Sequence, residues 1–297
     1  MGALMPRPPQ PVTPPHSMTV TAQELIEGQL NLPTLPTIVA KINALVDDPE
    51  VGTREIGQAV NEDAPIAAQV LRIANSAFYG LRAKVLSTEH AAAILGVRQL
   101  RNIAMQASVI KDFKHMEKTP ALDLDAHWRA SILTSQLCSE MSRRCRARVD
   151  LAPEEFHVVG LLLDIGKVVL LEGLGARYAE ILQEGADKGL QQHEAEQRAL
   201  GFDHTKVGAL VATKWGLFAT VADAIERHHQ SSSELIGTPV ANLVSHVNRI
   251  ALAICAGDLT RAREVCGPET LNDLGLREAD VEHIIEVGCE SLPGILV

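Results

Sequence analysis

Aromatic residues are scarce in this 297-residue sequence, where tryptophan, tyrosine and phenylalanine together make up 3% of the chain. Proteins that bind single-stranded nucleic acid stack the bases on exposed aromatic rings, so this class is disfavoured. The formal net charge of −10 also repels a phosphate backbone. We therefore expect a protein that does not bind nucleic acid.

Cysteines are few, odd in number and not arranged in any Cys-x-x-Cys motif. The five are Cys138, Cys145, Cys255, Cys266 and Cys289. This pattern favours reduced thiols in a reducing compartment over a disulfide framework or a zinc knuckle. We expect a cytoplasmic protein.

Long apolar runs are also missing. Asp164 and Lys167 interrupt the longest one, which extends from Gly160 to Gly173, so no segment is expected to cross a membrane. The first residues contain many prolines and no continuous apolar segment of the kind found in signal peptides. Residues 1–18 are predicted to form a disordered, proline-rich tail.

Helical patterns dominate the rest of the chain. Apolar residues recur at helical spacing, as at Ile38, Ile42 and Leu45, and no run alternates as a strand would. The sequence predicts an all-α fold with two helical lobes, residues 19–118 and 119–297. The longer predicted helices cover residues 97–113, 126–144, 153–172, 204–216, 220–229 and 238–257.

Two charged residues lie within the predicted helix 153–172. Asp164 and Lys167 are three residues apart, so they share a helical face and can form an ion pair. The alternative is a metal or phosphate site, which needs further ligands. His204 at the start of one helix, and His228 and His229 at the end of another, are candidates, although the latter two also suit a helix C-terminus electrostatically.

Familiar catalytic motifs are absent. The sequence has no His-Glu-x-x-His zinc motif, no Gly-x-Ser-x-Gly nucleophile elbow and no Gly-x-x-x-x-Gly-Lys-Ser/Thr phosphate loop. The residues alone therefore indicate a helical protein with a polar pocket around Asp164.

Three segments of the first lobe carry a recognisable pattern: LPTLPTIVAKINALVDD (32–48), NEDAPIAAQVLRIANSAFYGL (61–81) and STEHAAAILGVRQLRNIAM (87–105). They resemble HDOD domains, which are bacterial signalling and output domains related to the HD-superfamily metal-dependent phosphohydrolases. The resemblance extends from about Leu30 to Leu252. One departure is that the usual Asp-Pro start of a helix reads Asp63-Ala64 here, with the proline at Pro65.

In the second lobe, the segments HWRAS, GLLLDIGK, GFDHTKVGALVATKWGL, IERHH and SHVNRIA resemble the HD phosphohydrolase core. In catalytic relatives a first histidine, a His-Asp dyad and a later aspartate hold the metal. The resemblance places these at Ala130, at Leu163 with Asp164, and at Asn248. Ala130 and Leu163 offer no lone pair and Asn248 offers only a neutral carbonyl, whereas a transition metal usually needs three good protein ligands.

The resemblance thus implies a vestigial pocket at Ala130, Leu163, Asp164, Lys167, His204, His228, His229 and Asn248. We expect no metal, no cofactor and no catalysis, and we expect Asp164 to pair with Lys167 or one of the histidines. The implied function is a bacterial signal-transduction module that binds a protein partner. Phe78 and Tyr79 are candidate contact residues, although both rings could instead pack between the lobes.

Two alternatives remain open. The first is a residual metal-dependent phosphohydrolase that acts on a nucleotide or cyclic nucleotide, with Asp164, His204 and His228 or His229 as metal ligands. The second is a sensor whose pocket binds a small anion or nucleotide without cleaving it.

Overall fold

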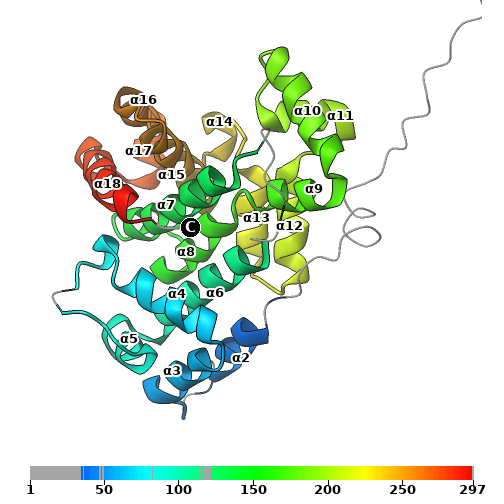
Figure 1. The fold of residues 1–297 in the computed structure, drawn as a ribbon. Coiled ribbons are helices and arrows are strands. Elements are labelled where there is room, and N and C mark those ends of the chain that lie inside the picture. Colours follow the sequence, from blue (N-terminus) through cyan, green and yellow to red (C-terminus); the bar gives the residue numbers. More distant parts are fainter. Residues whose placement is uncertain are drawn as a thin grey trace, which may run out of the picture.

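In the computed structural model the chain folds into an all-α structure with two lobes (Figure 1). The structure describes residues 35–295 apart from residues 36, 47, 49, 82, 114, 115 and 117–121, and these described residues contain no strand. The predicted tail, residues 1–18, lies outside the described residues. None of the helices described has the length and apolar character needed to cross a membrane.

The first lobe lies at the lower end of Figure 1 and is coloured blue to cyan-green. Its elements are α2 (Thr37–Val46), α3 (Thr53–Asn61), α4 (Ala64–Ala74), the 3-10 turn η2 (Ala77–Tyr79), α5 (Thr88–Leu95) and α6 (Val97–Phe113). Asp63 caps α4 by accepting a hydrogen bond from the backbone N–H of Ile66 at 3.1 Å, and Pro65 occupies the first turn, where it costs no helical hydrogen bond.

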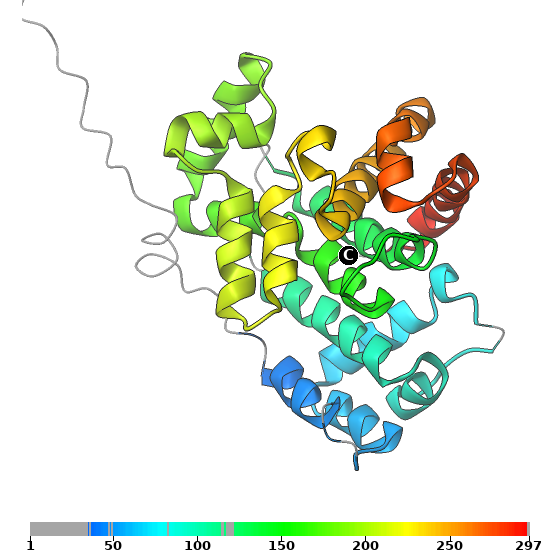
Figure 2. The ribbon, with the colours of Figure 1, turned by 180° about the vertical axis from the view of Figure 1, so that it is seen from behind.

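The second lobe contains the remaining helices and winds from green to red. They are α7 (Leu124–Ser142), α8 (Pro153–Leu162), α9 (Ile165–Leu174), α10 (Ala176–Asp187), α11 (Gln192–Leu200), α12 (His204–Lys214), α13 (Ala219–Arg227), α14 (Ser232–Leu235), α15 (Pro239–Cys255), α16 (Leu259–Glu264), α17 (Pro268–Leu274), α18 (Glu278–Ser291) and η3 (Leu292–Gly294). Helices α7, α8 and α15 pack together at the centre, and α12 lies beside α13 and crosses α9 (Figure 2).

Helix α6 belongs to both lobes. Ile103 and Ala107 on one side are buried in the core of the first lobe, whereas Met105, Val109 and Phe113 are buried in the core of the second. Both cores therefore share one helix, which joins the lobes through packed side chains.

One predicted helix is wrong. The apolar stretch predicted as a single helix over residues 153–172 is divided into α8 and α9, with Leu163 and Asp164 at the break. Asp164 has φ −103° and ψ 14°, outside the helical region, which turns the chain at this point. The break frees the carboxylate of Asp164 to face the neighbouring helices instead of remaining on the face of one continuous rod.

Candidate functional site

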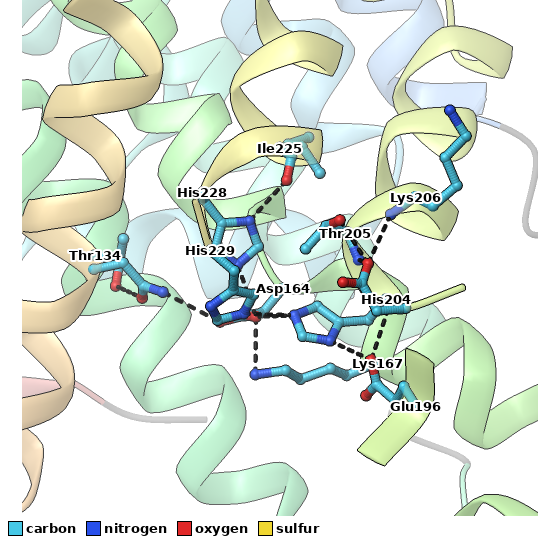
Figure 3. Close-up of polar contacts among 12 residues, drawn as sticks. Thr134, Asp164, Lys167, Glu196, His204, Thr205, Lys206, Ile225, His228 and His229 are labelled. Carbon is cyan, nitrogen blue, oxygen red and sulfur yellow. Dashed lines mark hydrogen bonds and ion pairs between the residues drawn. The ribbon is translucent and has the colours of Figure 1, made fainter. Parts of the chain in front are cut away.

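The Asp164 carboxylate lies at the centre of a polar cluster (Figure 3). Three nitrogen atoms surround its Oδ1: Lys167 Nζ at 2.9 Å, His204 Nε2 at 3.2 Å and His228 Nε2 at 3.5 Å. The expected partnership of Asp164 with Lys167 and with histidines is therefore present. Asp164 is 8% exposed, so these contacts stabilise a charge that burial alone would make very costly.

Helix α12 brings His204 to this carboxylate. Asp203 caps the helix by accepting hydrogen bonds from the backbone N–H groups of Thr205 at 3.0 Å and Lys206 at 3.4 Å. The start of α12 then crosses α9 at Gly166, where an added Cβ would lie 1.9 Å from the carbonyl oxygen of His204. Only glycine permits this approach of the two backbones. Since Gly166 lies two residues after Asp164, the crossing brings the start of α12, and with it His204, next to Asp164.

A buried glutamate fixes the orientation of the His204 ring. Glu196 Oε2 accepts hydrogen bonds from the backbone N–H of His204 at 2.7 Å and from its ring Nδ1 at 2.6 Å. The hydroxyl of Tyr178 donates to the other oxygen, Oε1, at 2.6 Å. Because Nδ1 donates to Glu196, the neutral ring of His204 presents the lone pair of Nε2 to Asp164.

Two adjacent histidines follow α13. His228 donates its ring Nδ1–H to the carbonyl oxygen of Ile225 at 2.7 Å, so its Nε2 also faces the cluster with a lone pair when the ring is neutral. His229 Nε2 lies 3.0 Å from His204 Nε2. The ring of His193 stacks on that of His229, with 4.2 Å between centroids.

The other predicted positions belong to α7, the break between α8 and α9, and α15. Asn248 Oδ1 accepts a hydrogen bond from the Thr134 hydroxyl at 3.0 Å, and its Nδ2 donates weakly to Asp164 Oδ2 at 3.5 Å. Ala130 lies one helical turn before Thr134 on α7, and Leu163 is fully buried. Together these residues provide an amide, a hydroxyl and apolar surface.

The charges at the centre shift the pKa values of its acidic and basic groups. Burial opposes the ionisation of Asp164, yet Lys167 and the two histidine contacts hold the pKa of its carboxyl well below the usual range. Burial and the charge of Lys167 oppose protonation of His204, but Glu196 and Asp164 raise the pKa of this histidine above its ordinary value. Burial lowers the pKa of His229, and the neighbouring histidines lower it further.

Four side chains form what we call the carboxylate–imidazole cluster: Asp164, His204, His228 and His229. Each offers one ligand atom, and these atoms all lie within 4.8 Å of one another. Asp164 Oδ1 and His228 Nε2 are buried and make no hydrogen bond of acceptable geometry. Three imidazoles and a carboxylate match the ligand preference of zinc and related transition metals, so the residues present fit such an ion.

This convergence bears on the expectation that no metal binds. That expectation rested on the ligands lost at Ala130, Leu163 and Asn248, and the structure places no ligand at Ala130 or Leu163. The phosphohydrolase alternative names Asp164, His204 and His228 or His229 as ligands, and the structure brings these side chains together with both histidines present. The residues without a ligand atom, Ala130 and Leu163, therefore leave the four members of the carboxylate–imidazole cluster in place.

Sequence reasoning missed Glu196, Tyr178 and Thr134. Glu196 lies in a polar helix whose other acidic residue, Glu194, is exposed, so no pattern distinguishes the buried carboxylate. Glu196 contacts His204 only because the chain turns at residues 201–203 and brings the start of α12 back beside α11. Tyr178 and Thr134 are recognisable only through the residues they contact.

Phe78 and Tyr79 belong to η2, which contacts α18. Their rings meet edge to face at 5.0 Å, and the hydroxyl of Tyr79 accepts a hydrogen bond from Gln99 at 2.7 Å. Phe78 lines a small cavity together with Ser291 and Ile295, at the end of the chain described. Both rings are half-buried: Tyr79 packs against the core of the first lobe, and Phe78 faces the C-terminal residues across the cavity, which favours packing over a contact surface.

Comparison with known proteins places these features in context. A family model described as the HDOD domain matches residues 32–231. A curated protein from Treponema pallidum (strain Nichols), described as uncharacterized, is 20% identical over 199 residues, which are 67% of this chain. The match covers 38% of that protein, so this chain spans well under half of its relative's length.

Solved structures share the fold. An HDOD domain protein with unknown function from Geobacter sulfurreducens has a TM-score of 0.75 and 24% identity, covering 93% of this chain and 97% of that one. A protein from Shewanella amazonensis SB2B named "Putative phosphohydrolase" has a TM-score of 0.71 and 22% identity, covering 95% of this chain and 99% of that one. At this level of identity the likeness establishes the fold.

Proposed function

Since the chain belongs to the HDOD family, we propose that it is a non-catalytic regulatory module of bacterial signal transduction that acts through a protein partner. The resemblance of the first lobe to signalling and output domains supports the regulatory part of this proposal. The chemistry of the pocket supports the non-catalytic part.

The observation that carries the proposal is the set of ligands available to a metal. All four members of the carboxylate–imidazole cluster lie close together, whereas Ala130 and Leu163 offer no ligand atom where catalytic relatives carry histidines. Among the described residues, the ligand atoms that converge here suit a single ion. For Zn²⁺, four protein ligands would fill a tetrahedral shell, whereas catalytic zinc sites keep a position for water or substrate. A zinc ion held by all four side chains would therefore leave no position for water or a phosphoryl group.

Lys167 supports the same conclusion. Its ammonium lies 2.9 Å from Asp164 Oδ1, and its side chain is only 12% exposed. A phosphodiester that entered the pocket would have to draw this ammonium away from a buried carboxylate, which would leave that charge uncompensated. The lysine is thus committed to the protein's own carboxylate.

The competing candidate is a residual metal-dependent phosphohydrolase. The fold shared with the Shewanella protein and the presence of four metal-binding side chains favour it. It requires an open coordination position, which would arise with a six-coordinate ion such as Mn²⁺ or Fe²⁺ or if one cluster member were released from the ion.

A hydrolysis assay separates the two candidates. The full chain is incubated with bis(p-nitrophenyl) phosphate and with cyclic dinucleotides, in the presence of Mn²⁺, Fe²⁺ or Zn²⁺. We expect no product above the rate of an Asp164→Ala variant, whose folding is verified by circular dichroism. Turnover that is present in the parent protein and lost in Asp164→Ala would contradict the proposal.

A further inference from the structure

We propose that a cavity between the two lobes binds a small organic anion with a flat ring, of the nucleoside monophosphate class. The cavity has a volume of about 340 Å³. Among the described residues that line it, none belongs to the carboxylate–imidazole cluster. The proposal goes beyond the regulatory function, because it assigns a ligand to a separate site and thereby gives the module an input.

The position of the cavity is the first argument. Asn43 on α2 contributes from the first lobe, Val158 on α8 and the turn between α12 and α13 contribute from the second, and the shared helix α6 contributes Arg98 and Arg101. In Figure 2 the turn between α12 and α13 points toward the blue helix α2. Ligand pockets commonly form at such boundaries. A molecule bound here would contact both lobes and hold their arrangement.

The two arginines are the second argument. Arg98 and Arg101 are three residues apart on α6, so they lie on the same face of this helix. Arg98 is exposed, and no other described residue forms an ion pair with it. A guanidinium group presents a planar fork of N–H donors that matches phosphate and carboxylate oxygens. This wall of the cavity therefore suits an anion.

An exposed aromatic ring is the third argument. Phe218 lines the cavity and is 65% exposed. It occupies the N-cap position of α13, which favours serine, threonine, aspartate or asparagine, and its side chain makes no capping hydrogen bond. The helix start thus forgoes a stabilising cap and exposes an apolar ring, a local cost that is typical of residues selected for binding. A flat heterocycle stacked on this ring would cover it.

A carboxylate in the lining distinguishes among anions. Glu155 Oε2 accepts a hydrogen bond from the backbone N–H of Ala152 at 2.6 Å, at the start of α8. The second oxygen of Glu155 can accept from a ligand, and the amide of Asn43 can donate or accept. Glu155 would repel a purely anionic ligand but would bind one that also carries hydroxyl or amino donors. An anionic group, a flat ring and such donors together describe a nucleoside monophosphate.

The size of the cavity favours a small molecule over a peptide. Its volume lies near the lower end of the range of about 300–1,000 Å³ found for small-molecule pockets, which suits one compact ligand. Peptides are instead bound in extended grooves or along sheet edges. An acidic segment of a protein partner would share the negative charge of the proposed ligand and would extend beyond the cavity.

The test is isothermal titration calorimetry on the full chain with AMP, GMP, CMP and UMP. The corresponding nucleosides and inorganic phosphate serve as partial ligands. We expect at least one monophosphate to bind at one site per chain. Its nucleoside and inorganic phosphate should each bind at least about tenfold more weakly, because each lacks either the charged group or the ring. Added salt should weaken the binding of the monophosphate.

Variants at the cavity separate binding from folding. Arg98→Ala is expected to weaken binding at least about tenfold, whereas Arg129→Ala, which removes an exposed arginine of α7 outside the cavity lining, should change it less than about twofold. Phe218→Ser removes the ring and supplies a capping hydroxyl to α13. It should weaken binding at least about fivefold, while the melting temperature of the ligand-free protein stays the same or rises.

Three results would overturn the proposal: no binding of any of the four monophosphates, equal affinity for a monophosphate and for inorganic phosphate, or unchanged affinity in both Arg98→Ala and Phe218→Ser. The first would point to an acidic segment of a protein partner as the occupant. All three would leave the proposed function standing, since it rests on the carboxylate–imidazole cluster. Metal-dependent hydrolysis that is lost in Asp164→Ala would have the opposite effect, because it would remove the proposed function and leave the ligand of the cavity in place.

Discussion

Glu196 Oε2 accepts two hydrogen bonds from a single residue, one from the backbone N–H of His204 and one from its ring, at 2.7 and 2.6 Å. The carboxylate therefore fixes both where α12 begins and how its first side chain is oriented. Neither carboxylate nor ring is exposed to solvent. Such a contact couples the stability of the helix start to the geometry of the pocket.

The first prediction concerns the removal of this carboxylate. Glu196→Ala leaves two donors of His204 and the Tyr178 hydroxyl buried without an acceptor, so we expect a loss of about 3 kcal/mol in the free energy of unfolding. Urea denaturation at constant pH measures it. Tyr178→Phe removes only one hydrogen bond and should cost about 1 kcal/mol. Equal losses in the two variants would show that the carboxylate does not organise His204.

The second prediction concerns the crossing of α9 and α12. In Gly166→Ala the new Cβ would overlap the carbonyl oxygen of His204, and its three nearest neighbours are all backbone atoms that cannot rotate away. We expect a loss of at least about 3 kcal/mol by urea denaturation. Gly267→Ala meets no atom within 4 Å and should cost at most about 1 kcal/mol. A stable Gly166→Ala protein would mean that the two helices can separate freely.

The sequence revealed part of this site and could not reveal the rest. The pairing of Asp164 with Lys167 follows from their spacing, and the resemblance of their segments locates His204 and His228. The break between α8 and α9 was missed because the apolar pattern continues through it without proline, and Gly166 fits that pattern as one more helical residue. Glu196 was missed because its burial is decided by contacts with residues distant in sequence.

The third prediction concerns the pH dependence of stability. His157 on α8 contacts Gln106 on α6 at 3.3 Å, and burial lowers the pKa of this histidine to about 4. The unfolded chain therefore takes up this proton near pH 6.5, before the folded protein does. Stability should fall as the pH drops from 6.5 to 4, by about 3 kcal/mol for this group, and should not depend on it at higher pH.

The variant His157→Gln tests this assignment, because glutamine retains a donor for Gln106 and does not titrate. Unfolding free energies of the two proteins are measured between pH 4 and pH 8. The difference between them should change across pH 4–6.5 and stay constant at higher pH. Two parallel curves over the whole range would show that His157 is not responsible.

The fourth prediction concerns the thiols, all of which are free. Cys255 and Cys289 are exposed, whereas Cys138 and Cys266 are buried, and burial raises the pKa of Cys266 to about 12. Iodoacetamide should therefore alkylate Cys255 and Cys289 in the native protein, and the two buried thiols only after unfolding. Peptide mass spectrometry identifies the modified positions. Rapid native labelling of Cys138 would contradict the packing of α7.

Helix α6 has a further consequence for how the chain comes apart. Met105 and Phe113 are buried in one core and Ile103 in the other. If either lobe unfolded, one side of α6 would therefore lose the apolar side chains that it packs against. Denaturation should accordingly proceed as one cooperative transition, although the chain is long enough for two independent folding units. After a proteolytic cut between Phe113 and Leu122, the two fragments should stay associated, because α6 in the first fragment would remain packed in the core of the second.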